Sequence, residues 1–117
     1  MKDNLSIKET LEMSKELWEK NKEDWSPMTP EYGRDSILYM VEEIGEVISI
    51  VKKKGENKIM NDSKIRERFV EEMCDVLMYY SDVLNRFDVS SEEIANKYQE
   101  KFNDNMNRNF IKDHIDS

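Results

Sequence analysis

Two pairs of carboxylates stand three residues apart within apolar stretches of this sequence. Glu43 and Glu46 lie in YMVEEIGEVISIV, and Glu72 and Asp75 lie in FVEEMCDVLMYY. Residues three apart in an α-helix share one face, so each stretch presents two carboxylates side by side. Four converging carboxylates repel one another and need a cation, and an all-oxygen set favours Mg²⁺, with Mn²⁺ as a substitute. We therefore expect the chemistry of a hard divalent cation.

Softer metals fit this sequence poorly. The chain has one histidine, His114, and one cysteine, Cys74. A di-iron carboxylate bundle uses two Glu-x-x-His motifs, and a zinc site takes cysteine and histidine ligands. Because Cys74 lies in an apolar helical stretch, we expect a buried thiol in a reducing compartment.

Helices are the elements that must position these carboxylates. The chain has only three glycines and two prolines to interrupt a helix. Ser6 with Glu9, and Ser90 with Glu93, form capping-box patterns that mark helix starts. The four helices expected from apolar spacing span residues 6–21, 35–54, 64–86 and 91–108.

The length predicts one domain over residues 1–117. Four helices joined by short connections predict an all-α, antiparallel four-helix bundle. We expect its core at about residues 35–108 and a frayed tail at 109–117. Both prolines fall in the connector 22–34, and residues 55–63 form a polar sequence that predicts a loop.

The short loop between the two acidic helices predicts an antiparallel hairpin. Glu46 and Glu72 are equidistant in sequence from Ile59, and so are Glu43 and Asp75. The two acidic pairs should therefore lie at one height above the turn. Helical phase puts each pair beside an apolar stripe that should face the core. The residues expected to face inward there are Ile44, Val47, Ile48, Val51, Met73, Val76, Leu77 and Tyr80.

Charge and hydropathy narrow the choice of partners. With 18 basic and 26 acidic residues, the net charge is −8, which argues against a nucleic-acid surface. No apolar stretch is long enough to span a membrane, and the amino terminus lacks the apolar run of a secretory signal. We expect a cytoplasmic protein.

EEIGEV followed by EEMCDVLMYYSDV resembles the ExxE…ExxD signature of the MazG-like nucleotide pyrophosphohydrolases. These belong to the all-α NTP pyrophosphohydrolase superfamily, together with dimeric dUTPases, dCTP pyrophosphatases and phosphoribosyl-ATP pyrophosphohydrolases. The resemblance covers roughly residues 35–108. It implies an enzyme that hydrolyses the α–β phosphoanhydride of a nucleoside triphosphate, which yields the monophosphate and pyrophosphate.

The resemblance also implies a role for individual residues. The motif carboxylates, Glu43, Glu46, Glu72 and Asp75, would hold Mg²⁺. One of them, or a neighbouring glutamate, would orient or deprotonate the attacking water. An aromatic residue and a Lys–Asn–Arg series would contact the substrate; these are Tyr79, Lys101, Asn105 and Arg108. Relatives form dimers or tetramers, so a homodimer or homotetramer is implied.

Two other functions stay open. The nearest is a different enzyme of the superfamily, either a phosphoribosyl-ATP pyrophosphohydrolase or a dUTP- or dCTP-specific member. The more distant is a non-catalytic helical bundle that binds a nucleotide or a partner through its acidic face. Turnover separates the enzymes from the binding protein, and substrate preference separates the enzymes from one another.

Overall fold

The computed structural model describes residues 1–108, in which the chain is helical and has no strand. This confirms the all-α prediction. The predicted frayed tail, residues 109–117, lies outside the described residues. The elements are α1 (Ile7–Asn21), the short 3-10 helix η1 (Pro30–Tyr32), α2 (Gly33–Lys54), α3 (Glu56–Asn61), α4 (Ser63–Arg86) and α5 (Ser91–Asn107).

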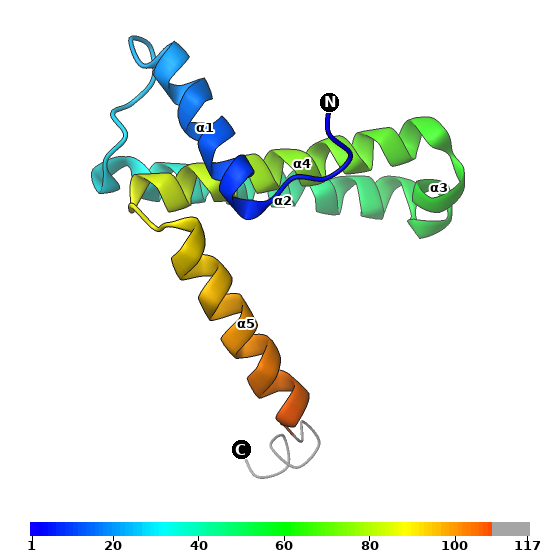
Figure 1. The fold of residues 1–117 in the computed structure, drawn as a ribbon. Coiled ribbons are helices and arrows are strands. Elements are labelled where there is room, and N and C mark those ends of the chain that lie inside the picture. Colours follow the sequence, from blue (N-terminus) through cyan, green and yellow to red (C-terminus); the bar gives the residue numbers. More distant parts are fainter. Residues whose placement is uncertain (109–117) are drawn as a thin grey trace.

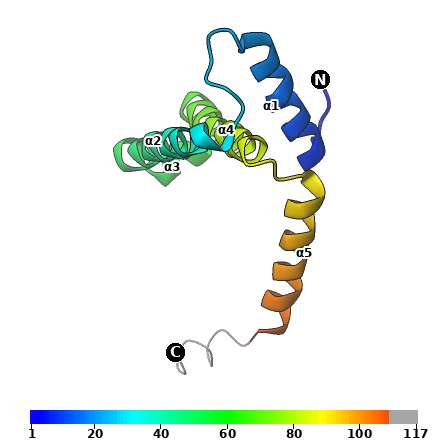
Figure 2. The same cartoon turned by 90° about the vertical axis from the view of Figure 1, so that its left-hand side faces the viewer.

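The helices α2 and α4 form a long antiparallel hairpin, and α3 makes its tip (Figure 1). The helix α1 packs across α4, whereas α5 projects away from the hairpin in both views (Figures 1 and 2). The helix α5 contacts α1, and its Ile94 and Tyr98 join Leu11 and Leu84 around a hollow of about 210 Å³. The four long helices therefore do not all lie side by side within one chain.

Both predicted capping boxes are present. The Ser6 hydroxyl accepts a hydrogen bond from the Glu9 backbone N–H (3.1 Å), and the Glu9 carboxylate accepts one from the Ser6 N–H (3.0 Å). Ser90 and Glu93 make the same reciprocal pair at 3.1 and 3.3 Å. These bonds satisfy N–H groups that a helix start leaves without partners, and so fix where α1 and α5 begin.

The hairpin tip differs from the predicted polar loop. Gly55, with a φ of 82°, ends α2 directly after the three lysines. The next residues form α3, whose Ile59 is buried against the hairpin. Asp62 then caps α4 by accepting hydrogen bonds from the N–H groups of Lys64 and Ile65. The prediction of a loop was wrong because burial of Ile59 stabilises a short helix between Gly55 and Asp62, where the neighbouring long helices end and begin.

The predicted register of the hairpin is confirmed. The Ser36 hydroxyl of α2 donates to the Asp82 carboxylate of α4 at 2.6 Å. The rings of Tyr39 and Tyr79 lie 5.9 Å apart between their centroids. Both pairs are equidistant in sequence from Ile59, as the sequence requires of residues that face each other.

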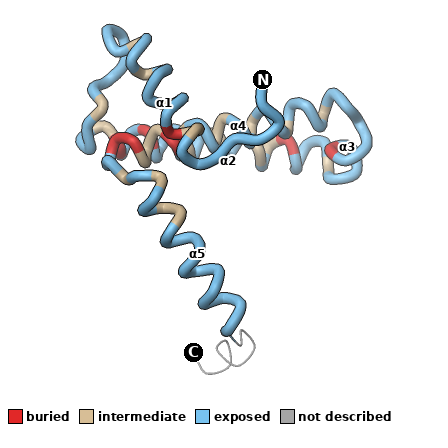
Figure 3. Tube along the Cα trace, viewed as in Figure 1, coloured by how far each residue is buried: buried red, intermediate tan, exposed pale blue. Residues whose placement is uncertain are grey.

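Most of the side chains predicted to form the core are exposed to solvent. Among residues 1–108 the buried hydrophobic side chains are Leu11, Ile50 and Ile59 (Figure 3). Val47 and Val76 are half-buried. The predicted inward positions that are instead exposed are Ile44, Ile48, Val51, Met73, Leu77 and Tyr80.

Two physical reasons account for this difference. The side of α2 that faces α4 carries Glu43, and the matching side of α4 carries Glu72, so the carboxylates take the position that the prediction gave to the apolar stripe. The apolar residues lie further round each helix, where residues 1–108 cover them incompletely: Leu77 and Tyr80 line a hollow with residues of α1 and α5 and are still exposed. Cys74, expected to be buried, is also exposed.

Close approach of two elements makes Gly33 a sensitive position. A methyl group added at Gly33 would collide with the Phe87 ring. We expect Gly33→Ala to lower the free energy of unfolding by about 1–3 kcal/mol, the usual cost of overpacking, although alanine is the better helix former. Urea denaturation measures this. Replacing the ring with a smaller side chain in the double variant Gly33→Ala/Phe87→Leu should recover part of the lost stability. A Gly33→Ala variant as stable as the wild type would contradict this account.

No helix among the described residues is long and apolar enough to cross a membrane.

Candidate metal centre

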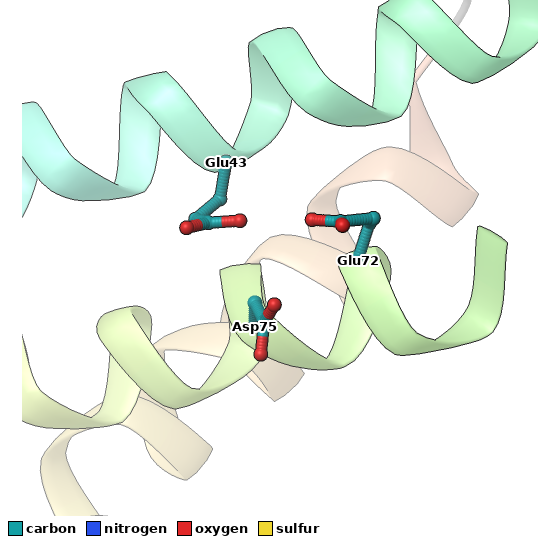
Figure 4. Close-up of side chains that lie close together, drawn as sticks. All are labelled: Glu43, Glu72 and Asp75. Carbon is teal, nitrogen blue, oxygen red and sulfur yellow. The ribbon is translucent and has the colours of Figure 1, made fainter. Parts of the chain in front are cut away.

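Three carboxylates meet between the two helices of the hairpin. Glu43 of α2 and Glu72 and Asp75 of α4 each offer one oxygen, and these oxygens lie within 4.8 Å of one another. Figure 4 shows Glu43 and Glu72 directed toward each other across the space between the helices. All three residues are half-buried. The arrangement gives a cation three oxygen ligands from two elements held in fixed register.

The electrostatics of this group favour a positive charge. The pKa of the Glu43 carboxyl lies above its usual value, first because of a hydrogen bond with Glu72 and then because of burial and the negative charges of Asp75, Glu72 and Glu46. Glu43 therefore holds a proton more readily than an isolated glutamate. A divalent cation that took the place of this proton would relieve the same repulsion.

The raised pKa of Glu43 predicts how stability depends on pH. The unfolded chain releases this proton near pH 4.5 and the folded chain at a higher pH. The contribution of Glu43 to stability therefore falls as pH rises from 4.5 through the folded pKa. We expect Glu43→Gln to gain stability over the wild type at neutral pH, with no gain below pH 4.5.

Thermal unfolding from pH 4 to pH 8 without divalent cations measures this gain. Glu42→Gln, at the exposed neighbouring position, is the matched control and should show no such trend. Millimolar Mg²⁺ at neutral pH should stabilise the wild type more than Glu43→Gln. A Glu43→Gln variant that is less stable than the wild type at every pH would contradict the assignment.

Tyr79 lies beside the carboxylates, where the sequence predicted an aromatic residue. Burial raises the pKa of its phenol, and the negative charges of Glu43 and Asp75 raise it further. Tyr79 therefore keeps its proton at neutral pH and can donate a hydrogen bond. Its ring packs at 41° to that of Tyr39, so the two tyrosines form an aromatic surface next to the acidic group.

The fourth predicted carboxylate, Glu46, is not part of the group of three. It is exposed on α2, one turn beyond Glu43 toward the carboxyl end of the helix. Its charge nevertheless contributes to the raised pKa of Glu43. The structure thus brings together three of the four predicted ligands and leaves the fourth nearby.

The predicted phosphate-contacting residues lie elsewhere in the chain. Lys101 and Asn105 are exposed in the carboxyl-terminal half of α5, and Arg108 caps that helix. This half of α5 lies away from the hairpin in both views (Figures 1 and 2). Within one chain the structure does not bring these three residues to the carboxylates.

A polar network next to the acidic group was not predicted from the sequence. Asp82 accepts hydrogen bonds from the Ser36 hydroxyl (2.6 Å) and the Arg86 guanidinium (2.7 Å). Arg86 pairs with Asp82, and the negative charge of Asp82 still contributes to the raised pKa of Tyr79. The i,i+4 spacing of Asp82 and Arg86 in an apolar helix was the signal that could have revealed this pair.

The fold and the site together define an all-α protein with a candidate divalent-cation centre. The oxygen ligands suit Mg²⁺ or Mn²⁺ and not a softer metal. No protein-family model, no curated protein and no solved structure matches this chain.

Proposed function

We propose that this protein is a Mg²⁺-dependent nucleoside triphosphate pyrophosphohydrolase, which converts a (d)NTP to the (d)NMP and pyrophosphate. The observation that carries the proposal is the meeting of Glu43, Glu72 and Asp75 beside Tyr79. Mn²⁺ is the expected substitute for Mg²⁺. We also propose a cytoplasmic location, where nucleoside triphosphates and Mg²⁺ are both available.

The reaction joins a water oxygen to the α-phosphorus and breaks the bond from that phosphorus to the bridging oxygen, so that pyrophosphate leaves. A bound Mg²⁺ ion would polarise the phosphate and make water more acidic. The cation would be held by Glu43, Glu72 and Asp75, with Glu46 within one helical turn of Glu43. One carboxylate of this set accepts the proton from the attacking water, as a general base does.

The aromatic side of the site suits the nucleoside. The Tyr39–Tyr79 surface adjoins the carboxylates and offers a ring on which a base can stack. The Tyr79 phenol, which stays protonated, can donate to a phosphate or sugar oxygen. Stacking alone does not distinguish one base from another, so the proposal extends to any (d)NTP.

The leaving pyrophosphate needs positive charge on the side away from the metal. In the proposal Lys101, Asn105 and Arg108 supply the polar contacts. In a single chain α5 points away from the hairpin, so these residues reach the phosphates only when α5 turns toward them or when another chain presents its own α5.

The experiment that tests the proposal is pyrophosphate release from the eight common NTPs and dNTPs, with phosphoribosyl-ATP as a ninth substrate. Release that requires Mg²⁺ supports the proposal. Strong preference for phosphoribosyl-ATP, dUTP or dCTP would instead identify a specialised enzyme of the same superfamily. Absence of release from every substrate would contradict the proposal.

The direction of α5 favours a second candidate, a non-catalytic bundle that binds a nucleotide or a partner through its acidic face. The cationic residues of α5 are separated from the carboxylates in one chain, as a binding protein without catalysis would allow. This candidate predicts thermal stabilisation by a Mg²⁺–nucleotide complex without turnover.

A further inference from the structure

The tip of the hairpin is a positive end on an acidic protein. Residues 52–68 carry seven basic and three acidic side chains, a net charge of +4, so the rest of this chain of net charge −8 carries −12. The seven cations come from the last turn of α2, from α3 and from the first two turns of α4, and all are exposed. We call them the basic tip, which comprises Lys52, Lys53, Lys54, Lys58, Lys64, Arg66 and Arg68.

The cations of the basic tip have no carboxylate partner among residues 1–108. The five ion pairs of this part of the chain all join residues outside the tip. The side-chain contact at the tip itself is between the Arg66 guanidinium and the Met60 sulfur, at 3.7 Å. The positive charge of the tip is therefore available to an anionic partner.

Helix stability explains only some of these cations. Lysines 52–54 lie in the last turn of α2, where the helix dipole favours positive charge. Lys64 and Arg66 lie among the first four residues of α4, where the dipole disfavours positive charge, and the first turn of that helix has no acidic residue. These two cations oppose the local electrostatics of their helix, and an external anion would relieve that opposition.

An exposed apolar side chain lies among the cations. Met60 of α3 is exposed by 66%, more than any large hydrophobic side chain of α2 or α4. The preceding residue, Ile59, is buried, so α3 packs onto the hairpin through Ile59 and leaves Met60 in solvent. Cations around an exposed apolar side chain suit the boundary between the headgroups and the acyl chains of a lipid bilayer.

The distribution of charge favours a flat anionic surface over a nucleic acid. The basic tip lies at the end of the hairpin away from α1 and α5 (Figure 1). Glu46 and Glu72 are eight residues from Lys54 and Lys64, about 12 Å along each helix and beyond the Debye length of about 8 Å at physiological salt. A duplex lying along the hairpin would bring phosphates to these carboxylates, and residues 52–68 include no aromatic ring on which a single strand could stack.

We propose that the basic tip docks end-on against an anionic membrane surface. The lysines and arginines lie among the lipid headgroups, Met60 lies at their boundary with the acyl chains, and the acidic middle of the hairpin stays in solution. Each cation near such a surface raises the affinity by about fivefold, so several together hold the protein at the bilayer without a spanning helix.

The test is co-sedimentation of the full chain with lipid vesicles, without nucleotide or divalent cation. We expect the wild type to bind vesicles of equal parts phosphatidylglycerol and phosphatidylcholine and not vesicles of phosphatidylcholine alone. Binding should fall as NaCl is raised, because salt screens the attraction. Absence of binding, or equal binding to both kinds of vesicle, overturns the proposal. Tighter binding to a labelled RNA strand or DNA duplex than to the anionic vesicles also overturns it.

A pair of charge-matched variants tests the position of the contact. Lys58→Gln/Lys64→Gln removes two cations of the tip and should lower the affinity for anionic vesicles by about 25-fold. Lys15→Gln/Lys20→Gln removes the same charge from exposed positions on α1 and should leave the affinity within about twofold of the wild type. Equal affinities of the two double variants overturn the proposal.

Met60→Gln tests the apolar part of the contact at constant charge. It should weaken binding to anionic vesicles by at least about twofold, since affinity for a bilayer grows with the apolar area buried in it. Helical circular dichroism checks that each variant is folded. A Met60→Gln variant that binds as tightly as the wild type overturns the placement of Met60 at the bilayer.

Discussion

Glu72→Gln is expected to lower Mg²⁺-dependent pyrophosphate release by at least about 100-fold, the effect of losing a catalytic carboxylate. One carboxylate oxygen each of Glu72, Glu43 and Asp75 lie within 4.8 Å of one another, so the uncharged glutamine side chain removes one negative charge from the group. It also removes a source of repulsion, so the folded chain should keep its helical circular dichroism. Initial rates at saturating nucleotide and Mg²⁺ measure the loss.

Glu71→Gln is the matched control for this substitution. Glu71 is the preceding residue on α4, is exposed and is not part of the carboxylate group. The rate of pyrophosphate release by Glu71→Gln should stay within about threefold of the wild-type rate, because a solvent-screened surface charge interacts only weakly with the site. Equal activity of the Glu71→Gln and Glu72→Gln variants would contradict the assignment of Glu72 to the catalytic site.

Arg86→Met is expected to lower the free energy of unfolding by about 3–5 kcal/mol, the usual effect of removing one partner of a buried ion pair. The Arg86 side chain is only 6% exposed and binds the Asp82 carboxylate at 2.7 Å. It also donates to the Ser26 hydroxyl and the Pro27 carbonyl, at 3.1 and 2.7 Å. Its loss leaves Asp82 charged without its cation and releases the connector between α1 and α2.

Urea denaturation at fixed protein concentration measures this loss, and Arg68→Met is its control. Arg68 is exposed on the same helix, so its replacement should change stability by less than about 0.5 kcal/mol. Replacing both partners in Arg86→Met/Asp82→Leu should cost less than Arg86→Met alone, because no charge is then left unpaired. Similar stability of Arg68→Met and Arg86→Met would contradict a structural role for the pair.

Local rules predicted the features that depend on few residues. The capping boxes at Ser6 and Ser90 and the helix end at Gly55 follow from contacts within four residues of each position. The register of the hairpin followed from its turn, because chain reversal fixes which residues stand opposite one another. This register is why the meeting of Glu43 with Asp75 could be predicted.

The features that were not predicted depend on which helix surfaces pack against each other, and a sequence pattern does not specify these pairings. The apolar stripe of α2 was assigned to the core, but Val47 is only half-buried and Ile44 and Ile48 are exposed. A 3.6-residue period shows that a helix has an apolar side, but it does not show which element covers that side. The direction of α5 was missed for the same reason, because its apolar residues Tyr98 and Phe102 are exposed in the single chain.

The most direct test of the central claim is product analysis after one turnover in ¹⁸O-labelled water. The wild-type chain with Mg²⁺ should give nucleoside monophosphate and pyrophosphate in equal amounts, with the label in the monophosphate because water attacks the α-phosphorus. Chelation of Mg²⁺ should stop the reaction. Formation of diphosphate and labelled inorganic phosphate, or turnover that persists without a divalent cation, would contradict the account.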